Sequence, residues 1–223
     1  MKSRMLMVFA FLLTALVIAG CSSTPRARES VQESAQMQPA EWNPQVMLYR
    51  NADVNIGQYR KVMLLPIEIY TGLDAEFRGV SEQEQQEMAG YLRSDVEKVL
   101  KEKNLLATQP GPDIARLKLI LAGLQKTRPV GSVVAHALPI GLALNLGKGA
   151  MGKSGSLMGT ATVGGEFTDS TNGTLIATFL VKEAPNAMDV TAIVSEWDAS
   201  KKAMDKIAQG LGDRLEKMQF GHR

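Results

Sequence analysis

Cysteine and histidine are scarce in this chain, whose 223 residues include one Cys and two His. One cysteine excludes a disulfide scaffold, and so few soft ligands exclude a structural zinc site. The formal net charge of +2 argues against nucleic-acid binding, which requires a strongly basic face. Aromatic residues make up only 5%, but 45% of the chain is hydrophobic, which suffices for one compact domain with an extension. We therefore expect no metal, no cofactor and no nucleic-acid partner.

A basic start and an apolar run occupy the first twenty residues. Lys2 and Arg4 precede the run 5–19, which only Thr14 interrupts. A helix of this length spans roughly 22 Å, less than the ~30 Å hydrocarbon core of a membrane. The pattern therefore predicts a cleaved signal peptide over 1–20 rather than a membrane span.

The run ends in Ile18, Ala19, Gly20 and Cys21, which resembles the lipobox of bacterial lipoprotein precursors. The resemblance implies that the Cys21 thiol receives a diacylglycerol and that the new N-terminus is acylated, which anchors the chain stably. Related lipoproteins that stay in the inner membrane carry Asp after the Cys, whereas Ser22 follows here. We therefore expect a lipid anchor in the outer membrane and a domain in the periplasm. The alternative is an ordinary signal peptide with a chance cysteine.

The composition changes after the cysteine. Residues 21–45 are rich in Ser, Gln, Glu, Arg and Pro and have no periodic apolar pattern, which predicts a flexible tether. A single domain is expected over 46–223, with a Gly-rich apolar insertion at 129–156.

The first half of the domain predicts a strand, a helix and a second strand. The apolar run 61–69 indicates a strand, and Pro66 places an edge or bulge near its end. Ser81 and Glu84 form a capping box that opens an amphipathic helix. The run 115–126 indicates the second strand.

The second half predicts a hairpin and a helix. Strands over 157–168 and 174–182 flank an Asn-Gly turn at 172–173, and a capping pair of Ser195 and Asp198 opens the last helix. The order is β-α-β-(insertion)-β-β-α. We therefore predict an α+β domain with a small, mostly antiparallel sheet of about four strands and two helices packed on one face. The apolar stripe expected on the last helix is Met204, Ile207, Ala208, Leu211, Leu215 and Met218.

Several phrases of this domain resemble domain-of-unknown-function family 3313, a set of Gram-negative lipoproteins. The resemblance covers roughly 45–220 and implies an envelope location and an α+β domain. The family carries no assigned activity, so the resemblance implies no mechanism. The matching phrases are Tyr59-Arg60-Lys61-Val62, Pro110-Gly111-Pro112-Asp113, Phe167-Thr168-Asp169-Ser170 and Trp197-Asp198-Ala199.

One motif points to nucleotide binding. Gly147, Gly152, Lys153 and Ser154 match the P-loop pattern G-x-x-x-x-G-K-S/T, whose backbone cradles phosphates at a helix N-terminus. A β-type run follows instead of a helix, and a secreted domain meets little nucleoside triphosphate. We therefore predict that the match is non-functional, that the chain has no catalytic residue and that it is not an enzyme.

The apolar insertion leaves two hypotheses open. Residues 130–146 carry no formal charge and contain Pro139, so the segment either packs on its own domain or contacts a membrane or another subunit. The leading hypothesis is a non-enzymatic, outer-membrane-anchored domain that binds another envelope protein or component. The alternative is an oligomeric export or pore accessory that uses 130–156, and a nucleotide-binding enzyme ranks last. A homo-oligomer stays open.

Overall fold

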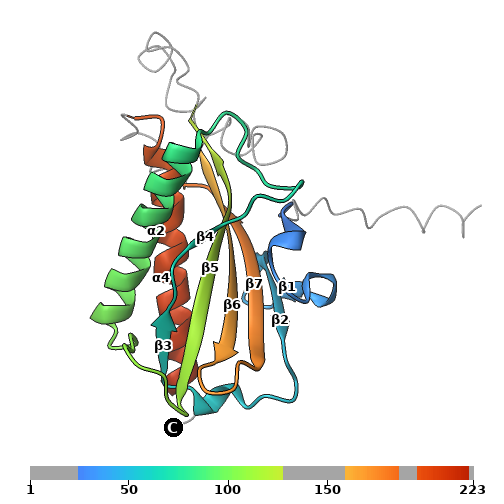
Figure 1. The fold of residues 1–223 in the computed structure, drawn as a ribbon, viewed down its shortest axis with the longest axis vertical. Helices are drawn as coiled ribbons and strands as arrows, with labels where there is room; N and C mark the ends of the chain where they lie inside the picture. Colours follow the sequence, from blue (N-terminus) through green and yellow to red (C-terminus); the bar gives the residue numbers. More distant parts are fainter. Residues whose placement is uncertain (1–24, 128–158, 186–194, 221–223) are drawn as a thin grey trace, which may run out of the picture.

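A computed structural model describes residues 25–127, 159–185 and 195–220 of the chain. Figure 1 shows one twisted sheet with the two long helices side by side against it. The helices are α2 (Glu82–Glu102) and α4 (Asp198–Phe220). The strands are β1 (Gln38–Ala40), β2 (Asn43–Arg50), β3 (Lys61–Leu64), β4 (Glu68–Ile69), β5 (Ile114–Gln125), β6 (Thr160–Asp169) and β7 (Leu175–Glu183).

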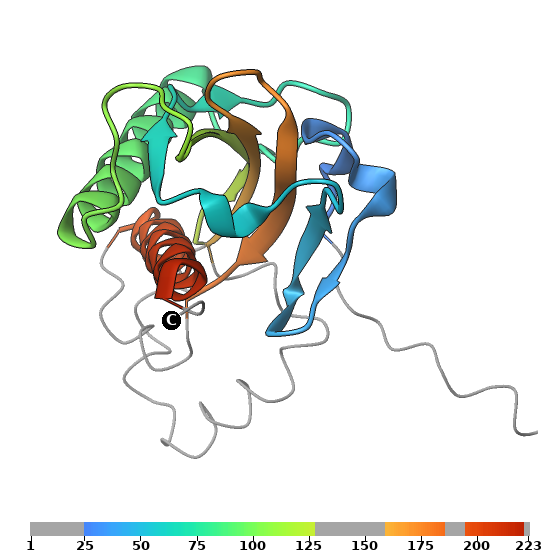
Figure 2. The same ribbon diagram turned by 90° about the horizontal axis from the view of Figure 1, so that it is seen from below.

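The sheet has seven strands in the order β1-β2-β7-β6-β5-β3, and β4 also pairs with β5. Strands β3 and β4 run parallel to β5, whereas the other neighbours are antiparallel. The strand expected over 61–69 is interrupted around Pro66, between β3 and β4. Proline has no backbone N–H group to donate to the neighbouring strand, so this irregularity agrees with the edge or bulge predicted there. Figure 2, seen along the strands, shows how the sheet curves.

The expectation of a small, mostly antiparallel sheet of about four strands is wrong, although the α+β class holds. The added strands are β1, which lies within the segment 21–45 that was expected to be a tether, and β2, which begins within that segment at Asn43 and continues to Arg50. Pro39 and Pro44 suggested an irregular chain there, but prolines are tolerated at sheet edges, where no partner requires their N–H group. The other difference is the parallel edge formed by β3, β4 and β5. Parallel strands are joined by a long crossover and not by a tight turn, so no local turn signal in the sequence indicates their pairing.

Residues 27–40 are folded against the sheet and are called the N-terminal cover below, so the expectation of a flexible tether over 21–45 is wrong for these residues. They form the short helices η1 (Arg28–Ser30) and η2 (Ser34–Gln36) and strand β1, and they cover the sheet face opposite α2 and α4. Val31 and Met37 pack there against Ile120 and Leu180, both of which are fully buried.

Polar contacts fasten this cover to the sheet. The Gln32 backbone N–H donates to Glu166 Oε1 at 2.9 Å, and the Gln32 amide donates to Glu166 Oε2 at 3.1 Å. Thr178 Oγ1 donates to the Gln32 carbonyl at 3.1 Å. Glu166 is 4% exposed and also pairs with Lys118 at 2.8 Å, so its charge is compensated where it is buried. Both faces of the central sheet are thus covered.

The helix starts follow their local signals. Glu84 N donates to Ser81 Oγ at 3.3 Å and Ser81 N donates to Glu84 Oε2 at 2.8 Å, which confirms the capping box. Ser195 N donates to Asp198 Oδ2 at 2.8 Å, which confirms the second capping contact.

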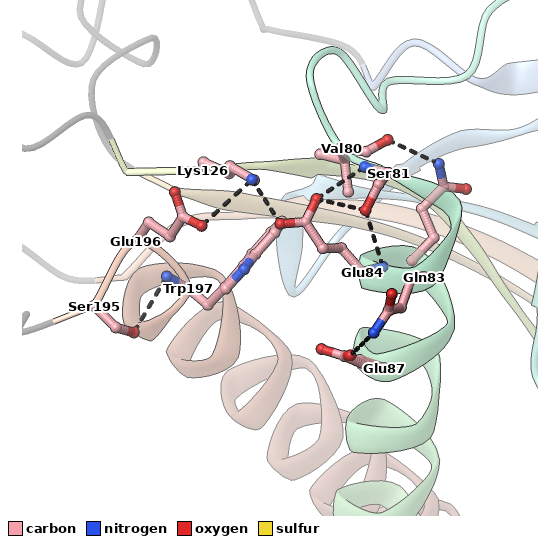
Figure 3. A network of polar contacts seen from close by, with 10 residues as sticks. Val80, Ser81, Gln83, Glu84, Glu87, Lys126, Ser195, Glu196 and Trp197 are labelled. Atoms are coloured by element: carbon pink, nitrogen blue, oxygen red, sulfur yellow. Dashed lines mark hydrogen bonds and ion pairs between the residues drawn. The ribbon is translucent and has the colours of Figure 1, made fainter.

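Lys126, next to the end of β5, joins the two helix starts, as Figure 3 shows. Its Nζ lies 2.6 Å from Glu84 Oε1 and 3.3 Å from Glu196 Oε1, and 5.1 Å from the centroid of the Trp197 ring. The hydrogen bond from Lys126, aided by the backbone of Ser81, lowers the pKa of Glu84 to about 2. The contact therefore persists over the neutral range.

The predicted hairpin of β6 and β7 is confirmed, and Gly173 in its turn has a φ of +78°. Asp169 organises the turn. Its carboxylate accepts from Thr171 N at 2.7 Å, Asn172 N at 3.1 Å and the Tyr59 hydroxyl at 2.8 Å. The hydrogen bonds from Thr171 and Tyr59 hold the pKa of Asp169 well below its usual range.

Candidate functional site

An apolar pocket of about 250 Å³ lies between the inner face of the sheet and the second half of α4. Figure 2 shows α4 and the curved sheet around this end of the molecule. The strands contribute one wall, and α4 contributes the other. The apolar lining includes Leu48, Phe179 and Val181 from the strands and Ile207, Leu211 and Leu215 from the helix.

The stripe of α4 explains why the pocket is there. The first part of this stripe, which includes Met204 and Ala208, is buried in the main core against the sheet and α2. In the second part, Leu211, Leu215 and Met218 are half-buried and face the pocket. A helix with an apolar stripe longer than its own core contact presents the remainder to a ligand or partner.

Two glycines of α4 have opposite surroundings. A Cβ atom built at Gly210, which lines the pocket, meets nothing within 4 Å. A Cβ at Gly212 would overlap Val99 Cγ1 and lie 3.0 Å from Lys103 Cδ, both on or next to α2. Gly212 is therefore required for the close approach of the helices, whereas Gly210 leaves space in the pocket.

This contrast gives a matched prediction. We expect Gly210→Ala to raise the free energy of unfolding by about 1 kcal/mol, because alanine is the better helix former and nothing opposes its methyl group. Gly212→Ala gains the same propensity but forces α2 and α4 apart, so we expect a net loss of about 1 to 2 kcal/mol. Urea unfolding of both variants measures the difference. Equal effects of the two substitutions would contradict the packing described.

Basic side chains surround the pocket. Arg50, Arg60, Lys61 and Arg214 contribute to its lining, and Lys206 lies beside them in an ion pair of 2.6 Å with Glu183. Among the described residues, no arginine forms an ion pair within 4.0 Å of a carboxylate. The rim therefore has an uncompensated positive charge.

Arg214, which is in α4, lines the pocket together with the apolar Leu211 and Leu215 of the same helix. Its guanidinium stacks on the Trp42 ring at 5.1 Å, and Trp42 itself is 45% exposed at the turn between β1 and β2. The Nε atom of Arg214 is buried, and no described residue accepts a hydrogen bond from it. An unsatisfied buried donor is uncommon in native proteins, and it marks Arg214 as a candidate ligand contact.

The lining combines apolar walls with a few charged side chains. Its described residues include no Cys, His, Ser or Asp that could act as a nucleophile or as a base in a triad, and Glu183 is held by Lys206. The described part of the chain also brings together no group of three or more His, Cys, Asp or Glu suited to a metal ion. An apolar cavity with a few charged groups at its mouth is typical of a site for an amphipathic ligand.

The site residues expected from the sequence lie outside the described residues. This applies to Cys21, to Ile18, Ala19 and Gly20, and to the insertion at 129–156 with its P-loop-like Gly147, Gly152, Lys153 and Ser154. The described chain resumes at Gly159 and enters strand β6 at Thr160. None of the described helices is long and apolar enough to cross a membrane.

The pocket itself was missed, although one signal pointed to it. The apolar stripe of α4 continues to Met218, and Gly210, which has no side chain, lies beside this stripe. A glycine beside a long apolar stripe can leave a cavity, but that inference requires the position of the opposite wall.

The comparisons with known proteins assign the chain to one family. The chain belongs to the family described as "Protein of unknown function (DUF3313)", whose profile matches residues 28–211. The match begins within the N-terminal cover, so the cover is part of the family domain. No curated protein matches the chain.

Solved structures resemble the chain distantly. The PelC dodecamer from Paraburkholderia phytofirmans is 11% identical, with 78% of this chain and 96% of that chain covered and a TM-score of 0.39. A PDZ domain protein from Parabacteroides distasonis is 11% identical, with 80% and 36% covered and a TM-score of 0.35.

Proposed function

We propose that this chain is an outer-membrane-anchored periplasmic lipoprotein whose domain binds an apolar ligand and catalyses no reaction. The observation that carries the proposal is the apolar pocket between α4 and the sheet, with a volume of about 250 Å³. An apolar cavity of ~150 Å³ already binds benzene, so the pocket exceeds the size needed for a small apolar group. The lipobox that ends at Cys21 supports the location.

The N-terminal cover adds a geometric argument to this proposal. Ala27 is fully buried on the sheet, so only the few residues from Cys21 onward separate the lipid from the folded domain. At most ~3.5 Å per residue gives a reach of about 20 Å. The domain is then held beside the membrane surface, where apolar ligands are concentrated, instead of ranging on a long tether.

Binding of a neutral fluorescent probe, N-phenyl-1-naphthylamine, tests the pocket. The chain for this experiment begins at residue 22 and so keeps every described residue. We expect saturable binding that weakens at least about tenfold in Gly210→Phe, because the ring fills the pocket and removes the contact area of one large side chain.

Gly90→Phe is the matched control. Gly90 lies in α2, and a Cβ atom there also meets nothing within 4 Å, but the position does not line the pocket. This variant should bind the probe like the unmodified chain. Unsaturable binding, or equal binding by both variants with their folds intact by circular dichroism, would overturn the proposal.

A further inference from the structure

We infer that the ligand of this pocket is an anionic amphiphile with one acyl chain, whose chain lies between α4 and the sheet and whose headgroup pairs with Arg214. The inference rests on the proposed function and specifies its ligand class. It is argued from the charge of the rim, the surroundings of Arg214 and the size of the pocket.

Unpaired basic side chains gather at the rim of the pocket. Half-buried lysines are compensated in this protein, since Lys103, Lys118, Lys126 and Lys182 each lie within 3 Å of a carboxylate oxygen, whereas no described arginine has such a partner and three arginines line this one pocket. At the pocket, the Arg50, Arg60 and Arg214 side chains have no carboxylate partner among the described residues. A cluster of uncompensated cations beside an apolar wall complements a ligand with a negative head and an apolar body.

Arg214 has the geometry for the headgroup contact. The guanidinium lies over the Trp42 ring at 5.1 Å, and its planar fork of donors matches a carboxylate or phosphate group. The buried Nε requires an acceptor, which no described residue supplies. A carboxylate or phosphate oxygen at this edge would satisfy that donor and neutralise the charge together.

The volume limits the apolar part. Scaling from the ~150 Å³ cavity that holds the six carbons of benzene, about 250 Å³ accommodates roughly ten carbons. This is one acyl chain of medium length, or the inner part of a longer one. Two chains of a membrane diacyl lipid exceed the space.

Other occupants fit the rim less well. The apolar segment 130–146 of the chain has no formal charge, so it would leave the arginines uncompensated. A neutral lipid would also leave the arginines without a negative partner. Both remain distinguishable outcomes of the experiment, because neither predicts a preference for anions.

Displacement of the neutral probe by decyl compounds tests the inference at neutral pH, below their micellar concentrations. We expect decanoate and decyl phosphate to displace it at least about tenfold more tightly than decanol, and decyltrimethylammonium to be weakest. Octanoate should bind about fifteenfold less tightly than decanoate, since each buried CH₂ changes the affinity about fourfold. Longer chains should gain little. A stronger response to decanoate supports a free fatty acid as the source, and a stronger response to decyl phosphate supports a lysophospholipid.

Arg214→Met should remove most of the difference between decanoate and decanol while probe binding persists. Arg78→Met, which replaces an exposed arginine away from the pocket, should keep that difference. If Arg214→Met does not fold, the double variant R50Q/R60Q changes only exposed rim side chains and should lower the anion preference about threefold or more.

Equal binding of decanol and decanoate, or an anion preference that survives both sets of substitutions, would overturn the inference. The probe is neutral, so its binding reports the apolar pocket and not the charge of the rim. Failure of the unmodified chain to bind the probe would therefore contradict the proposed function itself. Retained probe binding without an anion preference contradicts the ligand class alone.

Discussion

A Cys21→Ser variant is expected to keep residues 1–20 and to disappear from the outer membrane. The lipobox ends at the chain's single cysteine, and a hydroxyl cannot take the thioether-linked diacylglycerol that the resemblance to lipoprotein precursors implies. Without that lipid, cleavage and the second acylation do not follow. Each acyl CH₂ in the bilayer contributes ~0.8 kcal/mol, so removing the acyl chains abolishes stable anchoring.

Separation of inner and outer membranes and gel mobility of the full chain measure this effect, and labelling with a palmitate analogue reports acylation directly. Ser22→Asp is the matched control: it should stay lipidated but move to the inner membrane, since Asp after the cysteine is the retention signal that the resemblance implies. Normal processing and outer-membrane recovery of Cys21→Ser would show that the lipoprotein assignment is incorrect.

A chain that begins at residue 41 is expected to be about 4 kcal/mol less stable than one that begins at residue 25. The shorter chain lacks Val31 and Met37, and it exposes Ile120 and Leu180, which they cover. Burial of one such side chain contributes about 1.5 to 3 kcal/mol, and ordering the deleted segment offsets part of the sum. The remaining loss is a large part of a typical domain stability of about 5 to 15 kcal/mol.

Urea unfolding of the two truncated chains measures the difference in the free energy of unfolding. The chain from residue 25 is the control because it keeps all described residues. We also expect the shorter chain to aggregate, since it presents an uncovered sheet face and a new edge at β2. Equal unfolding midpoints would mean that residues 27–40 act as the flexible tether first expected.

The folded cover shortens the chain between the proposed anchor and the domain. A tether from 21 to 45 would let the domain reach far from its membrane. With residues 27–40 folded on the sheet, the proposed lipid anchor at Cys21 would lie only a few residues from the folded domain that contains the pocket.

Sequence reasoning succeeded where the information is local. The capping box of Ser81 and Glu84 joins residues three positions apart, and the Asn-Gly turn places a positive φ at Gly173. The amphipathic stripes of α2 and α4 follow the helical period, so their buried faces could be read before their partners were known. Membership of the family was recognisable from short phrases of the same kind.

The remainder depends on contacts between distant parts of the chain. Gln32 and Glu166, which fasten the N-terminal cover, are 134 positions apart, and the parallel pairing of β3 with β5 crosses over α2. The pocket exists because α4 extends past its core contact beside Trp42, whose partner Arg214 lies at the other end of the sequence. Local patterns specify which residues prefer burial, but they do not specify which surfaces meet or what space remains between them. For that physical reason the two helices, the hairpin and the family could be read from the residues, whereas the seven-stranded sheet with both faces covered and its charged pocket required the folded chain.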